Sequence, residues 1–234
     1  MDCLCQEIAG KDIKLSPTCL GQLWMFNNLE PSDLAVLSRE ARRKKMEKGQ
    51  MLFMQSDPAD ELFLIKGGRI KLVKIFEDGG ELILDIRKAG DFVGENIFSD
   101  KGEYPVSAIC LEDTLTCGYS RDQFEQLVLK NPNIGLQVIR NLTERVSWLT
   151  SQVGSLAVTN IEERLYSVLR NVAKEHGTAN DRGWEIQFPL THEDLSFLIG
   201  AHRVSITRAM KTLKGAGKII LEGKKLILLS QNVA

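Results

Sequence analysis

Hydrophobic positions between Thr191 and Leu213 recur at helical spacing in two separate groups. The first group ends at Gly200 and the second begins at Val204. A glycine between two such groups gives the backbone the freedom that a tight turn between helices needs. Thr191, followed by Asp194 at the third helical position, resembles a capping box and marks the start of the first helix. The pattern predicts a helix-turn-helix.

Two β-rich runs follow these helices. They span 218–221 and 225–229 and flank a Glu-Gly-Lys turn. Short β-rich segments joined by a glycine turn are typical of a hairpin. A hairpin directly after a helix-turn-helix predicts a winged helix.

Earlier in the chain, from Lys48 to Tyr119, the pattern changes to short β-runs separated by glycines. Asp78-Gly79-Gly80 is a hairpin turn between two of these runs. Short strands with turn signals at regular intervals are typical of a sandwich or barrel. We expect the first large domain to be all-β.

A helical run from Arg121 to about Val158 separates the two patterns. Its apolar residues recur at alternating spacings of three and four, which is the seam of a two-stranded coiled coil. This predicts a homodimer, and the alternative is that the stripe packs on the β-domain of its own chain. The predicted dimer interface consists of Ile139, Leu142, Val146, Leu149, Val153 and Leu156.

The second helix of the helix-turn-helix carries a basic field. Between Ala201 and Lys225 there are seven Lys and Arg residues and one acid, Glu222, which suits contacts with phosphate oxygens. The alternative is an ordinary two-helix corner with a solvated charged face. If the chain dimerises, two such helices one DNA turn apart predict a palindromic site. The predicted DNA-binding residues are His202, Arg203, Val204, Ser205, Thr207, Arg208 and Lys211.

Composition narrows the class of protein. A chain of 234 residues with a net charge of -1 has room for two domains, and its basic field is offset by acids between Glu77 and Glu103. No apolar stretch approaches the roughly 20 residues of a membrane span, and the N-terminus lacks the order of a secretory signal. Five cysteines argue against a disulfide framework, so we expect a cytoplasmic protein with no membrane partner. The absence of GxSxG, P-loop and zinc-type histidine motifs argues against an enzyme.

Together these patterns predict four segments. They are a cysteine-bearing N-terminal arm (1–20), a β-roll sensor domain (21–130), a dimerisation helix (131–158) and a winged helix-turn-helix DNA-binding domain (159–234).

The chain resembles one known family along essentially its whole length. The resemblance rests on GDFVGE in a glycine-punctuated β-region, on the long helix, and on LTHEDLSFLIGAHRVSITRAMKTLKGAGKI. It is similar to the cyclic-AMP receptor protein and fumarate-nitrate reduction regulator (CRP/FNR) family. The resemblance implies an α+β fold with an N-terminal cyclic-nucleotide-binding-like β-roll (jelly roll), a long dimerisation helix and a C-terminal winged helix-turn-helix. It also implies a homodimeric transcription factor that binds double-stranded DNA and contacts RNA polymerase.

The resemblance places an effector pocket at Gly94, Glu95 and Ser107. Family members that bind a cyclic nucleotide carry an Arg-Ser pair there, and the guanidinium neutralises the phosphate. This chain has Val106 before Ser107, so we do not expect cyclic AMP. The three histidines all lie at position 176 or later, so the sensor has no histidine ligand for haem. We do not expect haem, and ligation of haem by a cysteine stays open as an alternative.

Cysteines are the remaining candidates for the signal. Oxygen-sensing members of the family hold an iron-sulfur cluster with thiolates from an N-terminal arm and one from the β-roll. The resemblance assigns this role to Cys3, Cys5, Cys19 and Cys117. Two alternatives stay open: a thiol switch of reversibly oxidised cysteines, and a small organic effector with incidental cysteines.

The reading of DNA bases depends on the residue before Ser205. Many family members have a glutamate there, which accepts a hydrogen bond from cytosine, whereas this chain has Val204. Valine offers only apolar contact, best suited to a thymine methyl, so we predict half-sites richer in A and T than the family sequences TTGAT or TGTGA. A function of another class is a β-roll regulatory module that acts on a protein partner, but this leaves the winged helix unexplained.

Overall fold

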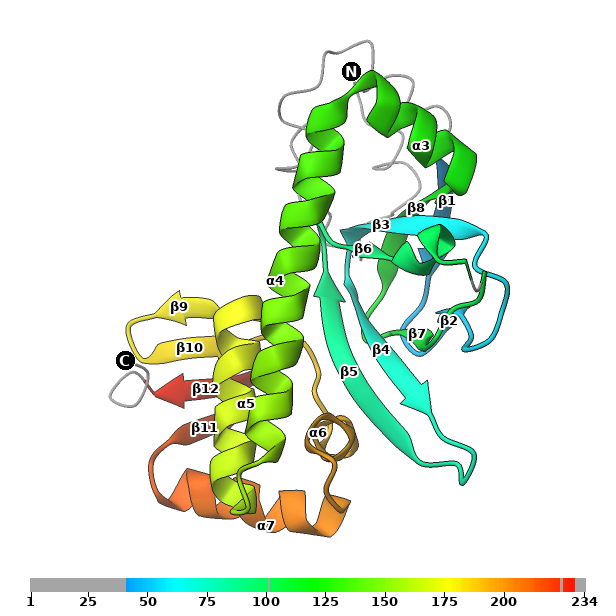
Figure 1. Cartoon of the computed structure of the whole chain (residues 1–234). Coiled ribbons are helices and arrows are strands. Elements are labelled where there is room, and N and C mark those ends of the chain that lie inside the picture. Colours follow the sequence, from blue (N-terminus) through cyan, green and yellow to red (C-terminus); the bar gives the residue numbers. More distant parts are fainter. Residues whose placement is uncertain (1–40, 101, 224, 230–234) are drawn as a thin grey trace. The chain divides into compact units, whose positions relative to one another are not determined.

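A computed structural model describes residues 41–100, 102–223 and 225–229, apart from the side chain at position 137 (Figure 1). The chain forms two compact units. Of the described residues, the first unit contains 41–79 together with 84–146, and the second contains 80–83 and those from 147 to 229.

The first unit is built on two four-stranded sheets whose paired strands run antiparallel. One sheet has the order β1-β8-β3-β6, formed by β1 (Arg42–Met46), β8 (Thr114–Ser120), β3 (Glu61–Gly67) and β6 (Phe92–Val93). The other has the order β2-β7-β4-β5, formed by β2 (Met51–Phe53), β7 (Ser107–Cys110), β4 (Arg69–Ile75) and β5 (Glu81–Lys88), of which residues 81–83 belong to the second unit. A short 3-10 helix, η3 (Glu95–Phe98), follows β6. This is the predicted β-roll.

Strand β3 contributes side chains to two apolar clusters of the β-roll. Side chains alternate between the faces of a strand, and here both faces are covered. Leu62 and Leu64 enter one apolar cluster, while Phe63 and Ile65 enter another. The continuous apolar run of β3 therefore reflects burial on both sides.

The helical run predicted from Arg121 to about Val158 is two helices rather than one. Helix α3 (Arg121–Lys130) starts at a capping box of Ser120 and Gln123, and α4 (Pro132–Leu156) follows after Asn131. A residue before proline avoids helical geometry, and Asn131 accordingly has φ -131° and ψ 78°. Proline lacks an N–H group but is well suited to the first position of the second helix.

The second unit contains three further helices and a four-stranded sheet. The helices are α5 (Ile161–His176), α6 (His192–Ile199) and α7 (Arg203–Gly215). The sheet has the order β11-β12-β10-β9, formed by β11 (Ile219–Glu222), β12 (Lys225–Leu229), β10 (Gly183–Ile186) and β9 (Thr178–Asn180). Hairpin β11–β12 is the predicted wing, whereas β9 and β10 were not predicted. No helix in the described part of the chain is long and apolar enough to cross a membrane.

Candidate nucleic-acid interface

Helix α6 starts at the predicted cap. The Thr191 hydroxyl accepts a hydrogen bond from the Asp194 backbone N–H at 3.0 Å, and Asp194 Oδ2 accepts one from the Thr191 N–H at 3.0 Å. This reciprocal pair satisfies two N–H groups that a helix start leaves without partners. The box fixes where α6 begins, and with it the position of the turn that follows.

The turn between α6 and α7 depends on Gly200. This residue has φ 60° and ψ 47°, a left-handed conformation that glycine adopts without steric cost. The Ala201 N–H then donates to the Ser196 carbonyl at 3.0 Å, which closes the end of α6. Helix α7 begins three residues after Gly200 and is held by its apolar face, which consists of Ile206, Ala209, Met210 and Leu213.

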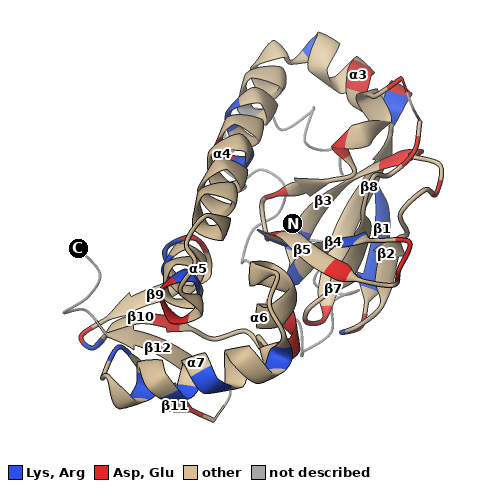
Figure 2. Cartoon of the chain, turned by 60° about the horizontal axis from the view of Figure 1, so that its bottom comes forward, with Lys and Arg blue, Asp and Glu red and all other residues tan. Residues whose placement is uncertain are grey.

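The opposite face of α7 carries the residues predicted to bind DNA. All of them are exposed except Ser205, which is partly exposed, and 64% of Val204 is accessible. Arg203, Arg208 and Lys211 form no side-chain hydrogen bond or ion pair with the residues that the structure describes. Figure 2 shows basic positions along the length of α7. The face therefore offers cations that are not neutralised within the described chain.

The wing is less basic than its sequence suggested. Lys225 Nζ lies 2.7 Å from Glu185 Oε1, and Arg182 forms a two-pronged ion pair with Glu222 at 2.7 and 3.0 Å. The Lys218 ammonium lies 5.0 Å from the centre of the Tyr166 ring. Among the described residues of this region, the unpaired positive charge is thus concentrated on α7, because neighbouring groups engage Lys225 of β12 and Lys218 before β11.

Sequence reasoning missed one polar contact between the two helices. His192 Nδ1, at the start of α6, lies 3.0 Å from the Thr207 hydroxyl on α7. The two residues are 15 positions apart, and no spacing rule connects positions on different helices. The sequence showed only that His192 and Thr207 are polar residues outside the apolar faces of their helices.

The three predicted effector residues lie in different surroundings. Gly94 has φ 88° and precedes η3, while Glu95 forms an ion pair with Arg87 at 3.0 Å. The fully buried Ser107 accepts a hydrogen bond from the Gln55 N–H at 2.9 Å. Ser107 also lines a cavity of about 340 Å³ with Met54, Gln55, Ile75, Phe76 and Glu77. Among the described residues, Glu95 and Ser107 share no hydrogen-bond or ion-pair partner.

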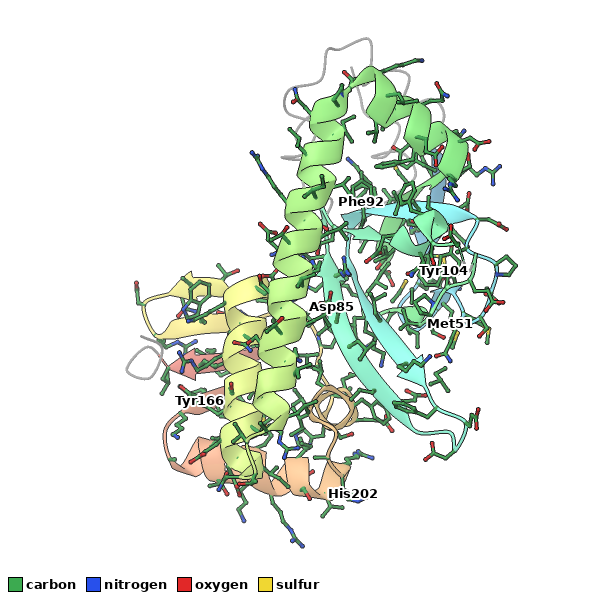
Figure 3. The ribbon with its side chains drawn as sticks, in the orientation of Figure 1. Met51, Asp85, Phe92, Tyr104, Tyr166 and His202 are labelled. Carbon is green, nitrogen blue, oxygen red and sulfur yellow. The ribbon has the colours of Figure 1, made fainter. Side chains whose placement is uncertain are left out.

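A buried ion network lies beside Glu95. Arg87 uses all three guanidinium nitrogens: Nε lies 2.6 Å from Asp85, Nη2 lies 3.0 Å from Glu95, and Nη1 donates to the Phe92 carbonyl at 3.0 Å. Side-chain exposure is only 4% for Arg87 and 2% for Asp85, which is labelled in Figure 3. Both charged side chains are thus buried within the first unit.

Helix α4 completes this network. Arg145 Nη2 lies 2.7 Å from Asp91 Oδ1 and Nη1 lies 3.8 Å from Asp85, while the Asn141 amide donates to Asp91 at 3.3 Å. Three carboxylates thus share two guanidinium groups. Burial raises the pKa of Asp85 to about 6, although Arg87 and Arg145 act to lower it.

The predicted dimer residues form an exposed apolar stripe along α4. Their accessible fractions range from 39% to 68%. Leu136, 55% exposed, extends the stripe toward the start of the helix. An apolar row that remains open to solvent is a typical protein-interaction surface.

The structure describes two of the five cysteines, and both are buried. Cys117 belongs to the apolar cluster that contains Leu64 and Phe124, whereas Cys110 belongs to the other cluster, where burial raises the pKa of its thiol. Cys3, Cys5 and Cys19 lie outside the described residues. Within the described residues, no three His, Cys, Asp or Glu side chains are grouped to hold a metal ion.

Comparison with known proteins identifies both halves of the chain. The family model of the cyclic nucleotide-binding domain matches residues 43–131, and that of the Crp-like helix-turn-helix domain matches residues 163–232. A CRP-like cAMP-activated global transcriptional regulator of Mycobacterium tuberculosis is 27% identical over 209 residues, which cover 89% of this chain and 93% of the relative. The fumarate and nitrate reduction regulatory protein of Escherichia coli is 27% identical over 219 residues, which cover 93% and 87%.

A solved structure has the same fold. It is a CooA mutant from Carboxydothermus hydrogenoformans, which superposes with a TM-score of 0.73 at 23% identity and covers 92% of this chain and 93% of its own. This likeness agrees with the predicted architecture of a β-roll, a long helix and a winged helix-turn-helix.

Proposed function

Because the chain belongs to the CRP/FNR family of transcription regulators, we propose that it acts as a homodimer that binds palindromic DNA through α7. The relatives regulate transcription, so the function is regulatory rather than enzymatic. The observation that supports DNA reading most strongly is the exposed face of α7, where Arg203, Arg208 and Lys211 have no ion-pair partner among the described residues. Such cations suit phosphate oxygens and base edges in the major groove.

The proposed division of labour on α7 follows from chemistry. Val204 contacts a thymine methyl, while Arg203 and Arg208 bind guanine or phosphate. His202, Ser205, Thr207 and Lys211 complete the contact surface. Selection of binding sites from random DNA tests this assignment. We expect a palindrome with A/T-rich half-sites, and recovery of an intact TTGAT half-site would contradict the role of Val204.

The alternative of another class is a β-roll module that acts on a protein partner. A gel-shift experiment distinguishes this module from a DNA-binding regulator. It compares the selected DNA site with a scrambled fragment at low and at moderate salt. A DNA-binding regulator gives a sequence-selective shift that falls steeply with salt. A module that acts on a protein partner gives no selective shift.

The proposed dimer interface is the exposed stripe of α4. Burying six aliphatic side chains from each protomer would remove a large apolar area from water, and that supplies the driving force. Sedimentation velocity of Val146→Glu tests it. We expect this variant to sediment as a monomer, whereas Val204→Glu, which places the same charge at an exposed valine on α7, stays dimeric. A dimeric Val146→Glu would place the interface elsewhere.

The residues of the β-roll do not fit a cyclic nucleotide. Val106 stands where the family carries its phosphate-binding arginine, and the guanidinium beside Glu95 is fully committed to Asp85, Glu95 and Phe92. The surplus carboxylate of the network would also repel a phosphate. We therefore propose a different signal.

Our proposed signal is oxygen or nitric oxide, sensed by an iron-sulfur cluster on Cys3, Cys5, Cys19 and Cys117. Thiolates are the donors such a cluster requires, and Cys117 is the described β-roll residue of this set. Anaerobic purification with iron and sulfide assays and a visible spectrum tests the proposal. Stoichiometric iron and sulfide, with absorption that bleaches in air, is expected for the wild type and Cys110→Ser but not for Cys117→Ser.

A colourless, iron-free dimer would favour the thiol switch or a small organic effector. Mass spectrometry of air-exposed protein separates these two, because only a thiol switch changes the mass by a reversible oxidation. In each case the signal changes the affinity of the dimer for DNA and thereby its contact with RNA polymerase.

A further inference from the structure

The side chain of Arg164 on α5 joins two segments that lie far apart in the sequence. Its Nε donates to the Val158 carbonyl at 2.9 Å, and its Nη1 donates to the Ile199 carbonyl at 3.2 Å. Val158 belongs to the α4–α5 linker (157–160), whereas Ile199 is the last residue of α6. Because the guanidinium is planar and rigid, it holds the two carbonyls in a fixed relation to each other.

The bond to Ile199 lies where α6 ends and the chain turns toward α7. The last four carbonyls of a helix have no partner within that helix, and a cation near them is stabilising. Gly200 then adopts its left-handed conformation, and α7 begins at Arg203. The position of the Arg164 guanidinium therefore contributes to fixing the point from which α7 starts.

The bond to Val158 attaches the α4–α5 linker to this same guanidinium. At one end of the linker, the Val158 N–H donates to the Ser155 carbonyl at 3.1 Å, in the last turn of α4. At the other end, the Asn160 side chain accepts a hydrogen bond from the Glu163 N–H at 3.0 Å and starts α5. These two bonds tie the linker to α4 and α5, and Arg164 adds a connection to α6.

We propose that Arg164 is a positioning residue for DNA reading, because it couples the α4–α5 linker to the turn that directs α7. A displacement of the linker either carries the guanidinium with it or breaks the bond to Val158. Both changes alter the support of the α6 end. Coupling is reciprocal, so DNA that binds α7 in turn restrains the linker. This inference rests on the proposed function, because its readout is DNA bound to α7.

A purely structural role for Arg164 would give a different result. If Arg164 only caps α6, its loss destabilises the helix-turn-helix but leaves the response of the linker to DNA unchanged. If Arg164 couples the two segments, its loss removes that response even where the variant still binds DNA. Exchange of the backbone amide hydrogens in the linker separates the two cases, because local restraint slows exchange.

The test is hydrogen–deuterium exchange, read by mass spectrometry, of the full-length dimer with and without a saturating amount of its selected DNA site. In the wild type we expect DNA to slow exchange in both α7 and the linker, by about threefold or more in the linker. In Arg164→Met, which keeps the apolar stem and lacks both donors, DNA should protect α7 but not the linker. We also expect this variant to bind the selected site about tenfold more weakly.

Two further variants sharpen the test. Arg164→Lys keeps the positive charge, but its single ammonium nitrogen cannot take the places of both Nε and Nη1. It should restore much of the melting temperature lost in Arg164→Met, because a cation remains near the end of α6, without restoring protection of the linker. If Arg164→Met does not fold, Arg164→Lys provides the comparison. Lys174→Met removes an exposed cation from the same helix and should behave as the wild type.

The outcomes separate this inference from the proposed function. Absence of sequence-selective DNA binding by the wild type would overturn the proposed function and this inference with it. Selective binding with equal linker protection in the wild type, Arg164→Met and Arg164→Lys would overturn the coupling role alone. The coupling role would also be wrong if DNA bound selectively but left the linker of the wild type unprotected.

Discussion

Replacing Asp85 by asparagine should stabilise the protein at neutral pH, although it removes a charge from an ion network. Asp85 is almost fully buried and shares Arg87 and Arg145 with Asp91 and Glu95. Within the described part of the chain, three carboxylates of this network face two guanidinium groups, so the carboxylates are in excess by one. The asparagine keeps an oxygen for the Ile86 N–H, which donates to Asp85 Oδ1 at 2.8 Å.

The size of the effect follows from the pKa of Asp85, which burial raises from 3.8 to about 6. A raised carboxyl pKa means that the folded state binds the proton more tightly than the unfolded state. Stability from this group is therefore greatest at acidic pH and is lost as the pH rises through the folded value. The full cost of ionising Asp85 in the folded state is about 3 kcal/mol, of which about 1 kcal/mol develops between pH 5 and 7.5.

Urea denaturation of wild type and Asp85→Asn at pH 5 and 7.5 measures this difference. The unfolding free energy of the variant, relative to wild type, should be about 1 kcal/mol higher at pH 7.5 than at pH 5. A difference that is constant with pH, or one that shrinks toward neutral pH, would refute the reasoning, because it would mean that Asp85 is fully compensated by its arginines.

Two further predictions concern the β-roll. Arg145→Met should destabilise the protein by about 3 to 5 kcal/mol, because it strips Asp85 and Asp91 of a buried partner, and addition of Asp85→Asn should recover part of the loss in urea denaturation. Gly94→Ala should lower the melting temperature more than Gly79→Ala. Both glycines have positive φ, but only at Gly94 would a Cβ lie 2.7 Å from the Glu61 carbonyl oxygen. Equal losses of melting temperature in the two variants would show that this close contact does not matter.

The buried faces of α6 and α7 could be predicted from the sequence, because their apolar residues recur with the period of a helix. Ile206, Ala209, Met210 and Leu213 recur at helical spacing, and the capping box and Gly200 mark the boundaries with local chemistry. Local signals of this kind do not depend on distant parts of the chain.

Features that depend on distant partners could not be predicted. Asp85 and Arg87 look like solvent-facing residues of a strand, and their burial requires Arg145, far along the chain, as a counterion. The contact of His192 with Thr207 depends on how two helices pack, which no spacing rule encodes. Strands β9 and β10 were missed because they are short, and β9 is entirely exposed.

The measurement that tests the central claim most directly is a salt titration of DNA binding by fluorescence anisotropy, with the selected palindrome and a scrambled duplex. We expect one dimer per palindrome, strong preference over the scrambled duplex, and a steep loss of affinity with salt that is shallower in Arg208→Ala. Equal affinity for both duplexes, or an Arg208→Ala variant with unchanged affinity and salt slope, would contradict the account of α7 as the DNA reader.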